Sequence, residues 1–353
     1  MRTLQTLVTA LLPLSSAVLV HANPPSVTSI ETVFTGFATE LRADDGVLVW
    51  DDGHIDAYDF QSREFHRIRT YNGSEDRGFL PDVSGRTVVW ADRSGSPANI
   101  HLYDLDTLAT RQITFGNEIK SFPTIEGGSV VWRQLSAGDS FDVFRATAPD
   151  FVPVAVANNP NAYEGDHEVS GNRILYAYAE GSPFLPGYRS IRVFDITTSS
   201  IIFERVVQFP GVSSPPRARI EGNIIMWTDS SSPDQTHIVN IETGEELFTR
   251  PDIAEIDISE THAVYWDYQL DTIFAFDFES KTTRPLVSGV DQIERNGLVI
   301  DGNRLTWSER AGNIWSIRSA VIIPEPSAIL LCASAVLFIG HRRRMAATRR
   351  VER

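Results

Sequence analysis

Short apolar segments alternate with polar turns along most of the chain, and they recur at regular intervals. The centre of each interval is an apolar triplet that ends in an aromatic residue. The seven triplets are Leu48-Val49-Trp50, Val88-Val89-Trp90, Val130-Val131-Trp132, Ile174-Leu175-Tyr176, Ile225-Met226-Trp227, Val264-Tyr265-Trp266 and Leu305-Thr306-Trp307. Successive aromatic residues lie 40, 42, 44, 51, 39 and 41 positions apart. A repeat of this length indicates a tandem array of structural units.

Each copy of the repeat contains three further segments. An apolar residue and a glycine turn precede the triplet, as in Val83-Ser84-Gly85, and glycine provides the positive φ of a tight hairpin. A segment of alternating apolar and polar residues follows, as in Ile100 to Leu105, and a fourth apolar segment ends the unit, as in Arg111 to Thr114. The period of two predicts four short strands per repeat, and no helical period separates them.

Seven units of four antiparallel strands are typical of a β-propeller. We therefore predict an all-β, seven-bladed propeller over residues 23–323. The blades are expected near residues 38–75, 76–118, 119–160, 161–210, 211–252, 253–290 and 291–322. The seventh copy lacks a fourth strand, whereas the apolar stretch 27–34 precedes the first copy. We expect residues 27–34 to complete blade seven, which closes the ring and covers an exposed edge.

The order of apolar-turn-glycine, apolar-apolar-aromatic and Tyr-Asp-apolar resembles the TolB-type, WD40-like propeller repeat across residues 38–322. This resemblance implies the fold and no particular activity. In such a fold the aromatic residues of the second strands would pack between adjacent blades. The sixth copy departs from the pattern, because Ser259-Glu260-Thr261-His262 replaces the glycine turn.

The first 22 residues predict a signal peptide. Arg2 precedes an apolar stretch from Leu4 to Val20, and Val20-His21-Ala22 has small or apolar residues at the positions that signal peptidase requires. We expect cleavage after Ala22. The protein would then be exported from the cytoplasm.

Residues 324–353 predict a second targeting segment. Pro324-Glu325-Pro326 precedes an apolar run from Ala328 to Gly340, which as a helix spans about 20 Å and is short for a bilayer core of about 30 Å. Arg342, Arg343 and Arg344 follow, and such a cluster holds a tail in the cytoplasm. This order resembles the PEP-CTERM sorting signal, which implies processing by an exosortase-type enzyme, transient membrane anchoring and delivery to the cell envelope or extracellular surface. A plain membrane anchor is the alternative.

Composition limits the class of partner. The chain is 42% hydrophobic, enough for a large core, and its formal charge is −15, which disfavours binding to nucleic acid. The single cysteine, Cys332, lies in the apolar run near the C-terminus, so no intramolecular disulfide can form. The two ends hold seven of the 31 basic residues, and their removal would make the remainder more acidic. No cofactor is expected from the sequence.

Candidate binding residues lie where long connections are expected, on the face that gathers the loops before strand one and after strand two of each blade. Glu180 to Ser190 is the longest expected loop between strands two and three, and Ala157 to His167 is the neighbouring loop between blades. Aromatic residues beside carboxylates and a histidine suit a sugar or a cation. The candidate ligand-binding residues are Tyr163, Glu164, Asp166, His167, Phe184 and Tyr188. The alternative is a solvated loop that only fills space at the channel mouth.

No catalytic residue can be assigned from the sequence. Histidines are scattered over different repeats, so a metal site would have to assemble across the ring, and whether one exists stays open. A Gly-Xaa-Ser-Xaa-Gly motif is absent. We expect a noncatalytic module that binds an extracellular protein or polysaccharide. The alternative is a carbohydrate-active enzyme, a polysaccharide lyase or hydrolase with its site at the channel mouth.

Overall fold

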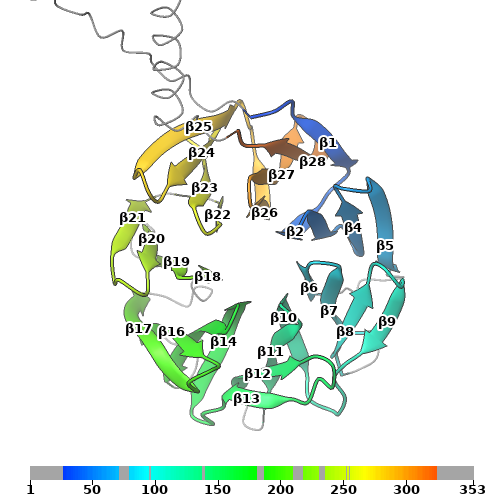
Figure 1. The fold of residues 1–353 in the computed structure, drawn as a ribbon, viewed down its shortest axis with the longest axis vertical. Helices are drawn as coiled ribbons and strands as arrows, with labels where there is room; N and C mark the ends of the chain where they lie inside the picture. The colour runs from blue at the N-terminus through cyan, green and yellow to red at the C-terminus, as the bar shows by residue number, and fades with distance from the viewer. Residues whose placement is uncertain are drawn as a thin grey trace, which may run out of the picture. The chain divides into compact units, whose positions relative to one another are not determined.

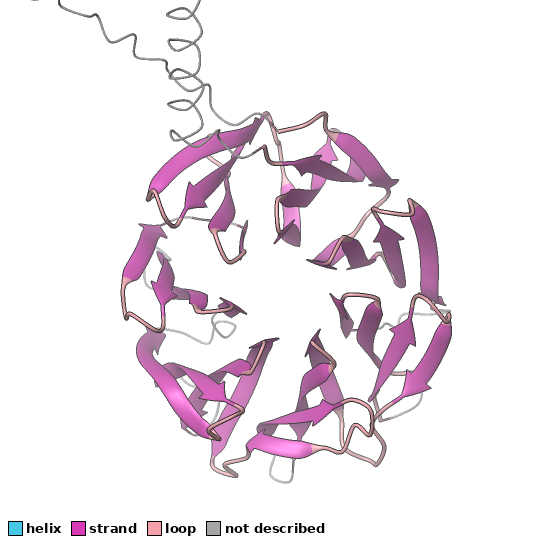
Figure 2. Cartoon of the chain, in the orientation of Figure 1, coloured by secondary structure: helices cyan, strands magenta, loops and turns pink. Residues whose placement is uncertain are grey.

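A computed structural model describes residues 27–70, 79–94, 97–136, 140–180, 187–209, 218–229, 235–251, 253 and 255–323. Within these residues 28 strands form seven four-stranded antiparallel sheets, arranged as blades around a central channel (Figure 1). All the elements drawn in the described part are strands and loops (Figure 2). The seven-bladed propeller predicted from the repeat is therefore confirmed. Among the described residues, no helix has the length and apolarity needed to cross a bilayer.

The first four blades follow the chain order from the innermost strand outward. Blade one contains β2 (Thr39–Asp44), β3 (Val47–Asp51), β4 (His54–Asp59) and β5 (Glu64–Thr70). Blade two contains β6 (Phe79–Ser84), β7 (Thr87–Asp92), β8 (Asn99–Asp104) and β9 (Ala109–Gln112). Blade three contains β10 (Lys120–Glu126), β11 (Ser129–Leu135), β12 (Phe141–Thr147) and β13 (Val154–Ala157). Blade four contains β14 (Ala162–Ser170), β15 (Arg173–Glu180), β16 (Gly187–Asp195) and β17 (Ser200–Phe209).

The last three blades complete the ring. Blade five contains β18 (Ala218–Glu221), β19 (Ile224–Asp229), β20 (Gln235–Asn240) and β21 (Glu246–Pro251). Blade six contains β22 (Glu255–Ile258), β23 (His262–Asp267), β24 (Thr272–Asp277) and β25 (Thr282–Ser288). Blade seven contains β26 (Ile293–Asp301), β27 (Arg304–Ala311) and β28 (Ile314–Val321), and its fourth strand is β1 (Glu31–Thr35).

The beginning of the described chain closes the ring. Strand β1 pairs antiparallel with β28, and an isolated bridge joins Val27 to Ile322 (Figure 1). The predicted closing strand thus occupies the expected place, although the regular pairing begins at Glu31 and not at residue 27. Because β1 covers the outer edge of β28, that edge is not free to pair with another chain.

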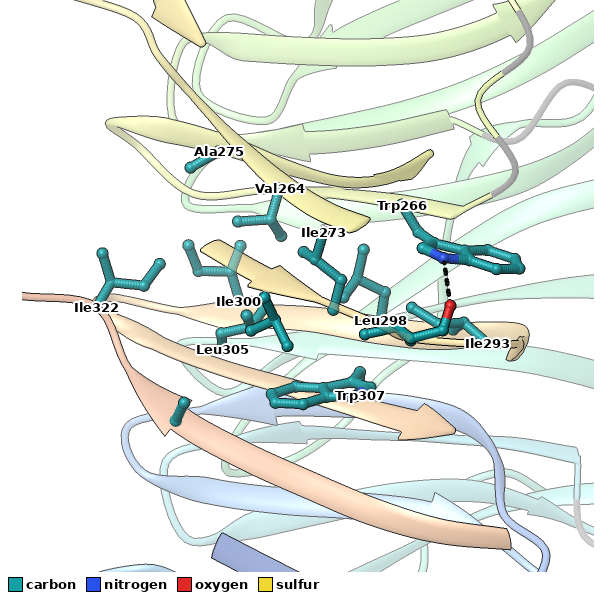
Figure 3. Packing of buried hydrophobic residues seen from close by; sticks show 13 residues of the cluster. Val264, Trp266, Ile273, Ala275, Ile293, Leu298, Ile300, Leu305, Trp307 and Ile322 are labelled. Atoms are coloured by element: carbon teal, nitrogen blue, oxygen red, sulfur yellow. Dashed lines mark hydrogen bonds between the residues drawn. The ribbon is translucent and has the colours of Figure 1, made fainter. Parts of the chain in front are cut away.

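The core consists of layers between neighbouring blades, and the seven aromatic residues of the triplets lie within them. Each is at most 7% exposed. Trp307 of blade seven lies in one cluster with Val264, Ile273 and Ala275 of blade six (Figure 3). Such rings each bury on the order of 150 to 250 Å², so they account for much of the adhesion between blades. The expected packing between blades is confirmed.

Two features of the repeat motif have clear local roles. The turn glycines between the first and second strands have positive φ, as the hairpin turn requires; φ is +53° at Gly85 and +55° at Gly222. The aspartate that ends the third strand accepts hydrogen bonds from the following turn, and Asp59 binds the N–H groups of Gln61 and Ser62 at 2.7 and 3.1 Å. The Tyr-Asp pair of the repeat therefore defines a strand end.

Candidate functional site

The innermost strands surround a cavity of about 140 Å³ in the central channel. It lies near the end of the channel where these strands turn into the second strands of their blades. Its lining includes five charged side chains at equivalent positions of five blades. They are Arg42, Asp82, Glu168, Arg219 and Asp257.

The carboxylates of this set connect each even-numbered blade to the next blade. Asp82 of blade two accepts a hydrogen bond from the backbone N–H of Ile125 at 2.8 Å. Asp257 of blade six accepts one from Ile300 at 3.0 Å, and Glu168 of blade four accepts one from Ile220 at 3.3 Å. Each carboxylate therefore satisfies a backbone donor of the neighbouring inner strand.

The two arginines join these carboxylates into a chain of ion pairs across the channel. Arg42 of blade one lies 3.8 Å from Asp82 and 3.7 Å from Glu168 of blade four, which is not its neighbour. Arg219 of blade five contacts Glu168 at 2.7 Å and Asp257 at 3.7 Å. Burial raises the pKa of Asp82 and of Asp257 to about 6, although the arginines oppose the shift. The network therefore spans the channel at this level.

A second set of side chains lies two residues further along each inner strand. Asp44 accepts a hydrogen bond from the N–H of Gly85 in the next blade at 2.8 Å, and Asp301 accepts one from Gly46 at 2.8 Å. Ser84 and Ser170 bind the turn glycines of their next blades in the same way. Glu126 likewise accepts from the N–H of Gly171. The glycine turns are thus tied to the preceding blade.

Glu221 of blade five is the exception in this set. The residue that it faces in blade six is Glu260, which replaces the turn glycine. Burial, followed by the nearby carboxylates of Glu126 and Asp257, raises the pKa of Glu221 to about 7. Glu221 also lines the cavity. The departure of the sixth copy from the repeat therefore alters the wall of the site.

The cavity is lined by charges of both signs, with an excess of carboxylates. The arginines and three of the carboxylates are engaged with one another, whereas Glu126 and Glu221 add negative charge nearer the strand ends. Such a concave site favours a ligand that presents a cationic group or several hydrogen-bond donors. In the described ranges, no group of three His, Cys, Asp or Glu side chains lies close enough together to hold a metal ion.

The structure places Tyr163, Glu164, Asp166 and His167 in strand β14 and not in a loop, so the expected loop position is wrong. Tyr163, Glu164 and His167 are at most 6% exposed. The sequence pattern misled here because β14 is nine residues long and contains a bulge at Asp166, whose φ is +46°. A bulge interrupts the alternation of apolar and polar residues that marks a strand.

These residues form a polar layer between blades three and four. The hydroxyl of Tyr163 accepts a hydrogen bond from Arg133 at 3.2 Å and donates one to Asp166 at 3.2 Å. Burial, with a contribution from Asp142, raises the pKa of Glu164 to about 7. Burial, reinforced by Arg133, lowers the pKa of His167 to about 4. These buried polar side chains therefore form part of the contact between blades three and four.

Most of the other predicted site residues lie outside the described part of the chain. Phe184 falls outside the described residues. Tyr188 lies in β16, where its backbone pairs with Gln208, and not in a loop as expected. The signal-cleavage residue Ala22 and the sorting motif residues Pro324, Glu325, Pro326, Arg342, Arg343 and Arg344 also lie outside the described residues.

Sequence reasoning missed the charged residues of the channel. The sequence does contain a signal, because a charged residue immediately precedes the recurring apolar-turn unit in most repeats, as in Asp82-Val83 and Arg219-Ile220. Charged side chains in the innermost strand of a blade are costly to bury unless they are paired. Their recurrence at one register position therefore indicates a paired network around the channel.

Comparisons with known proteins establish the fold alone. No protein-family model matches the chain, and no curated protein matches it in sequence. A chain of the mitotic checkpoint complex superposes with a TM-score of 0.59 at 10% identity, covering 92% of this chain and 99% of that one. The β-propeller domain of the Trilobed protease from Pyrococcus furiosus gives 0.59 at 10% identity, covering 81% and 96%. The Pyrococcus horikoshii acylaminoacyl peptidase gives 0.56 at 11% identity, covering 86% of this chain and 54% of that one.

Proposed function

We propose that the protein is an exported, noncatalytic propeller that binds an extracellular protein or polysaccharide. Export rests on the predicted signal peptide and on the PEP-CTERM-like tail, which implies an exosortase-type partner and transient anchoring in the membrane. The mature protein would then act at the cell envelope or extracellular surface. After removal of the two basic ends, the mature protein would carry a strong net negative charge toward its ligand.

The observation that carries the proposal is the charged cavity of the channel. Its deeper wall holds Arg42 and Arg219 in ion pairs, and Glu126 and Glu221 lie nearer the strand ends. A cationic group, such as a lysine side chain or an amino sugar, would meet carboxylates first and would be repelled by the arginines beyond them. We therefore expect the preferred partner to present positive charge.

A binding panel on the purified chain tests this function. Fluorescence anisotropy would compare a labelled lysine-rich peptide, an oligosaccharide of glucosamine and an acidic oligosaccharide at low and high salt. We expect binding of the two cationic probes, and a loss of about fivefold in affinity for each carboxylate removed by Glu126→Gln or Glu221→Gln. Glu279→Gln, which changes an exposed carboxylate on the β24–β25 turn, is the matched control.

Two results would contradict the proposal. Equal binding of acidic and cationic probes would show that charge does not select the partner. Unchanged affinity in the Glu126→Gln and Glu221→Gln variants, measured beside the control, would place the binding site elsewhere on the molecule.

A further inference from the structure

The inner strands are joined from blade to blade by side chains that accept backbone N–H groups, and one junction differs. Asp82, Glu168 and Asp257 make such bonds to blades three, five and seven. Asp44 and Asp301 make them to blades two and one. Across the junction from blade five to blade six, Arg219 of β18 forms an ion pair with Asp257 of β22 at 3.7 Å, and the described residues show no equivalent hydrogen bond from a backbone N–H of β22 to Glu221.

The cause of this difference is the replaced glycine turn in blade six. Ser259 accepts hydrogen bonds from the N–H groups of Thr261 and His262 in its own turn, at 3.4 and 3.2 Å. Glu260 occupies the position of the turn glycine, and its Oε1 atom lies 3.9 Å from where a Cβ atom on Gly222 would be. Glu221 therefore meets a carboxylate where the equivalent Glu126 meets a glycine N–H.

The surroundings of Glu221 are acidic on every inner strand that faces it. The carboxylates that act on it belong to β10, β22, the β22–β23 turn and β2. They are Glu126, Asp257, Glu260 and Asp44. The cation nearest along its own strand is Arg219, which is already paired with Glu168 and Asp257. Arg173 of β15 donates to the carbonyl of Gly222 and not to Glu221.

The outer part of the same junction is firmly held. Arg250 of β21 donates to the hydroxyl of Tyr265 at 2.6 Å and to the carboxylate of Asp267 at 2.5 Å, and both acceptors belong to β23. Blades five and six are therefore held by these outer bonds and by a buried apolar cluster that includes Met226, Ile258 and Tyr265. The carboxylates beside the channel are the unfavourable part of the junction.

We propose that the junction between β18 and β22 is a proton-controlled seam in the propeller, closed when Glu221 is protonated and loosened when Glu221 is ionised. This device rests on the proposed function, because Glu221 lines the cavity to which we assign ligand binding. Ionisation adds a negative charge to the cavity and weakens the adjacent junction at the same time. The cavity would therefore become more accessible and more attractive to cations as the pH rises.

The direction follows from the environment of the carboxyl. The pKa of Glu221, near 7, lies above that of an unfolded glutamate, so the closed state binds a proton that the unfolded chain releases. The stabilising effect of that proton is complete below about pH 4.5 and is lost as the pH rises through about 7. The seam responds in the range of ordinary extracellular acidification.

Hydrogen exchange measured by mass spectrometry on the ligand-free chain tests the seam. Exchange in peptides covering β18 and β22 would be compared between the native chain and Glu221→Gln at each pH from 5 to 8, so that the intrinsic rate cancels. We expect similar protection at pH 5 and about tenfold faster exchange in the native chain at pH 8. Peptides from β6 and β10 should show no such difference.

Two variants separate this device from a general effect of charge. Glu126→Gln removes the carboxylate that acts most strongly on Glu221, so it should shift the pH response of β18 and β22 to lower pH without abolishing it. Glu260→Gly restores the turn residue of the other blades and should abolish the response, because Glu221 could then accept the turn N–H. Equal exchange in the native chain and Glu221→Gln at every pH would overturn the proposal, as would an unchanged response in Glu260→Gly. Failure of cationic ligands to bind would leave these exchange results unaffected, so the two proposals can fail separately.

Discussion

Arg219 is the side chain whose removal should most disturb the channel. Its guanidinium contacts Glu168 at 2.7 Å and Asp257 at 3.7 Å, and the three side chains are only 21, 13 and 14% exposed. Arg219→Met keeps much of the apolar stem but leaves two poorly solvated carboxylates facing each other. Breaking a buried ion pair by removing one partner typically costs about 3 to 5 kcal/mol, and the partial exposure places this case near 3 kcal/mol.

The assay is urea denaturation followed by tryptophan fluorescence, at pH 8 and at pH 5. The cost should be smaller at pH 5, because the pKa of Asp257 is already about 6 beside Arg219 and rises further when that positive charge is lost. Protonation then relieves the repulsion. Adding Glu168→Gln to the variant should restore part of the stability at pH 8.

The matched control is Arg63→Met, which removes a guanidinium that is 75% exposed and lies 3.7 Å from Glu31. Exposed pairs of this kind contribute roughly 0 to 1 kcal/mol. A loss below about 1 kcal/mol for Arg219→Met at pH 8, or an equal loss at both pH values, would refute the view that the network stabilises the ring.

Three further predictions concern packing, closure and the layer between blades three and four. Trp132→Ala removes a fully buried ring between blades two and three and should cost roughly 3 to 5 kcal/mol in the free energy of unfolding, measured by the same denaturation assay. Deletion of residues 27–35 removes β1 and uncovers β28, so size-exclusion chromatography with light scattering should detect association; a stable monomer would contradict the closing role of β1. Glu164→Gln should raise stability by about 2 to 3 kcal/mol at pH 8 and by little at pH 5, because the pKa of about 7 makes the native carboxyl costly only when it is ionised; thermal unfolding at the two pH values would reveal the difference.

The ring architecture could be predicted because its determinants are periodic. Burial between blades requires an aromatic or apolar residue at the same place in every unit, and the series from Trp50 to Trp307 records that requirement directly. The turn glycines could be predicted for a similar reason, because few residue types other than glycine readily adopt a positive φ. Closure by residues near Phe34 followed from counting strands in the seventh copy.

The candidate site could not be predicted in the same way, because its residue types differ from blade to blade. Arg42, Asp82 and Glu168 are adjacent only after the ring has closed. Asp82 and Glu168 lie 40 and 126 residues after Arg42, and such spacings give no local indication of an ion pair. The position of Tyr163 was misjudged for a related reason, since the bulge at Asp166 hides a strand within a sequence that looks like a turn.

Closure by β1 has a consequence for biogenesis. Strand β1 must stay unpaired until β28, almost 290 residues later, has been synthesised. A contact of such long range forms slowly and late. The nascent chain therefore passes through a stage in which the strand edges of β1 and β28 are both unpaired and free to associate with other chains. Chaperones that shield unpaired strand edges would matter most in that interval, and a chain truncated before β28 could not close the ring.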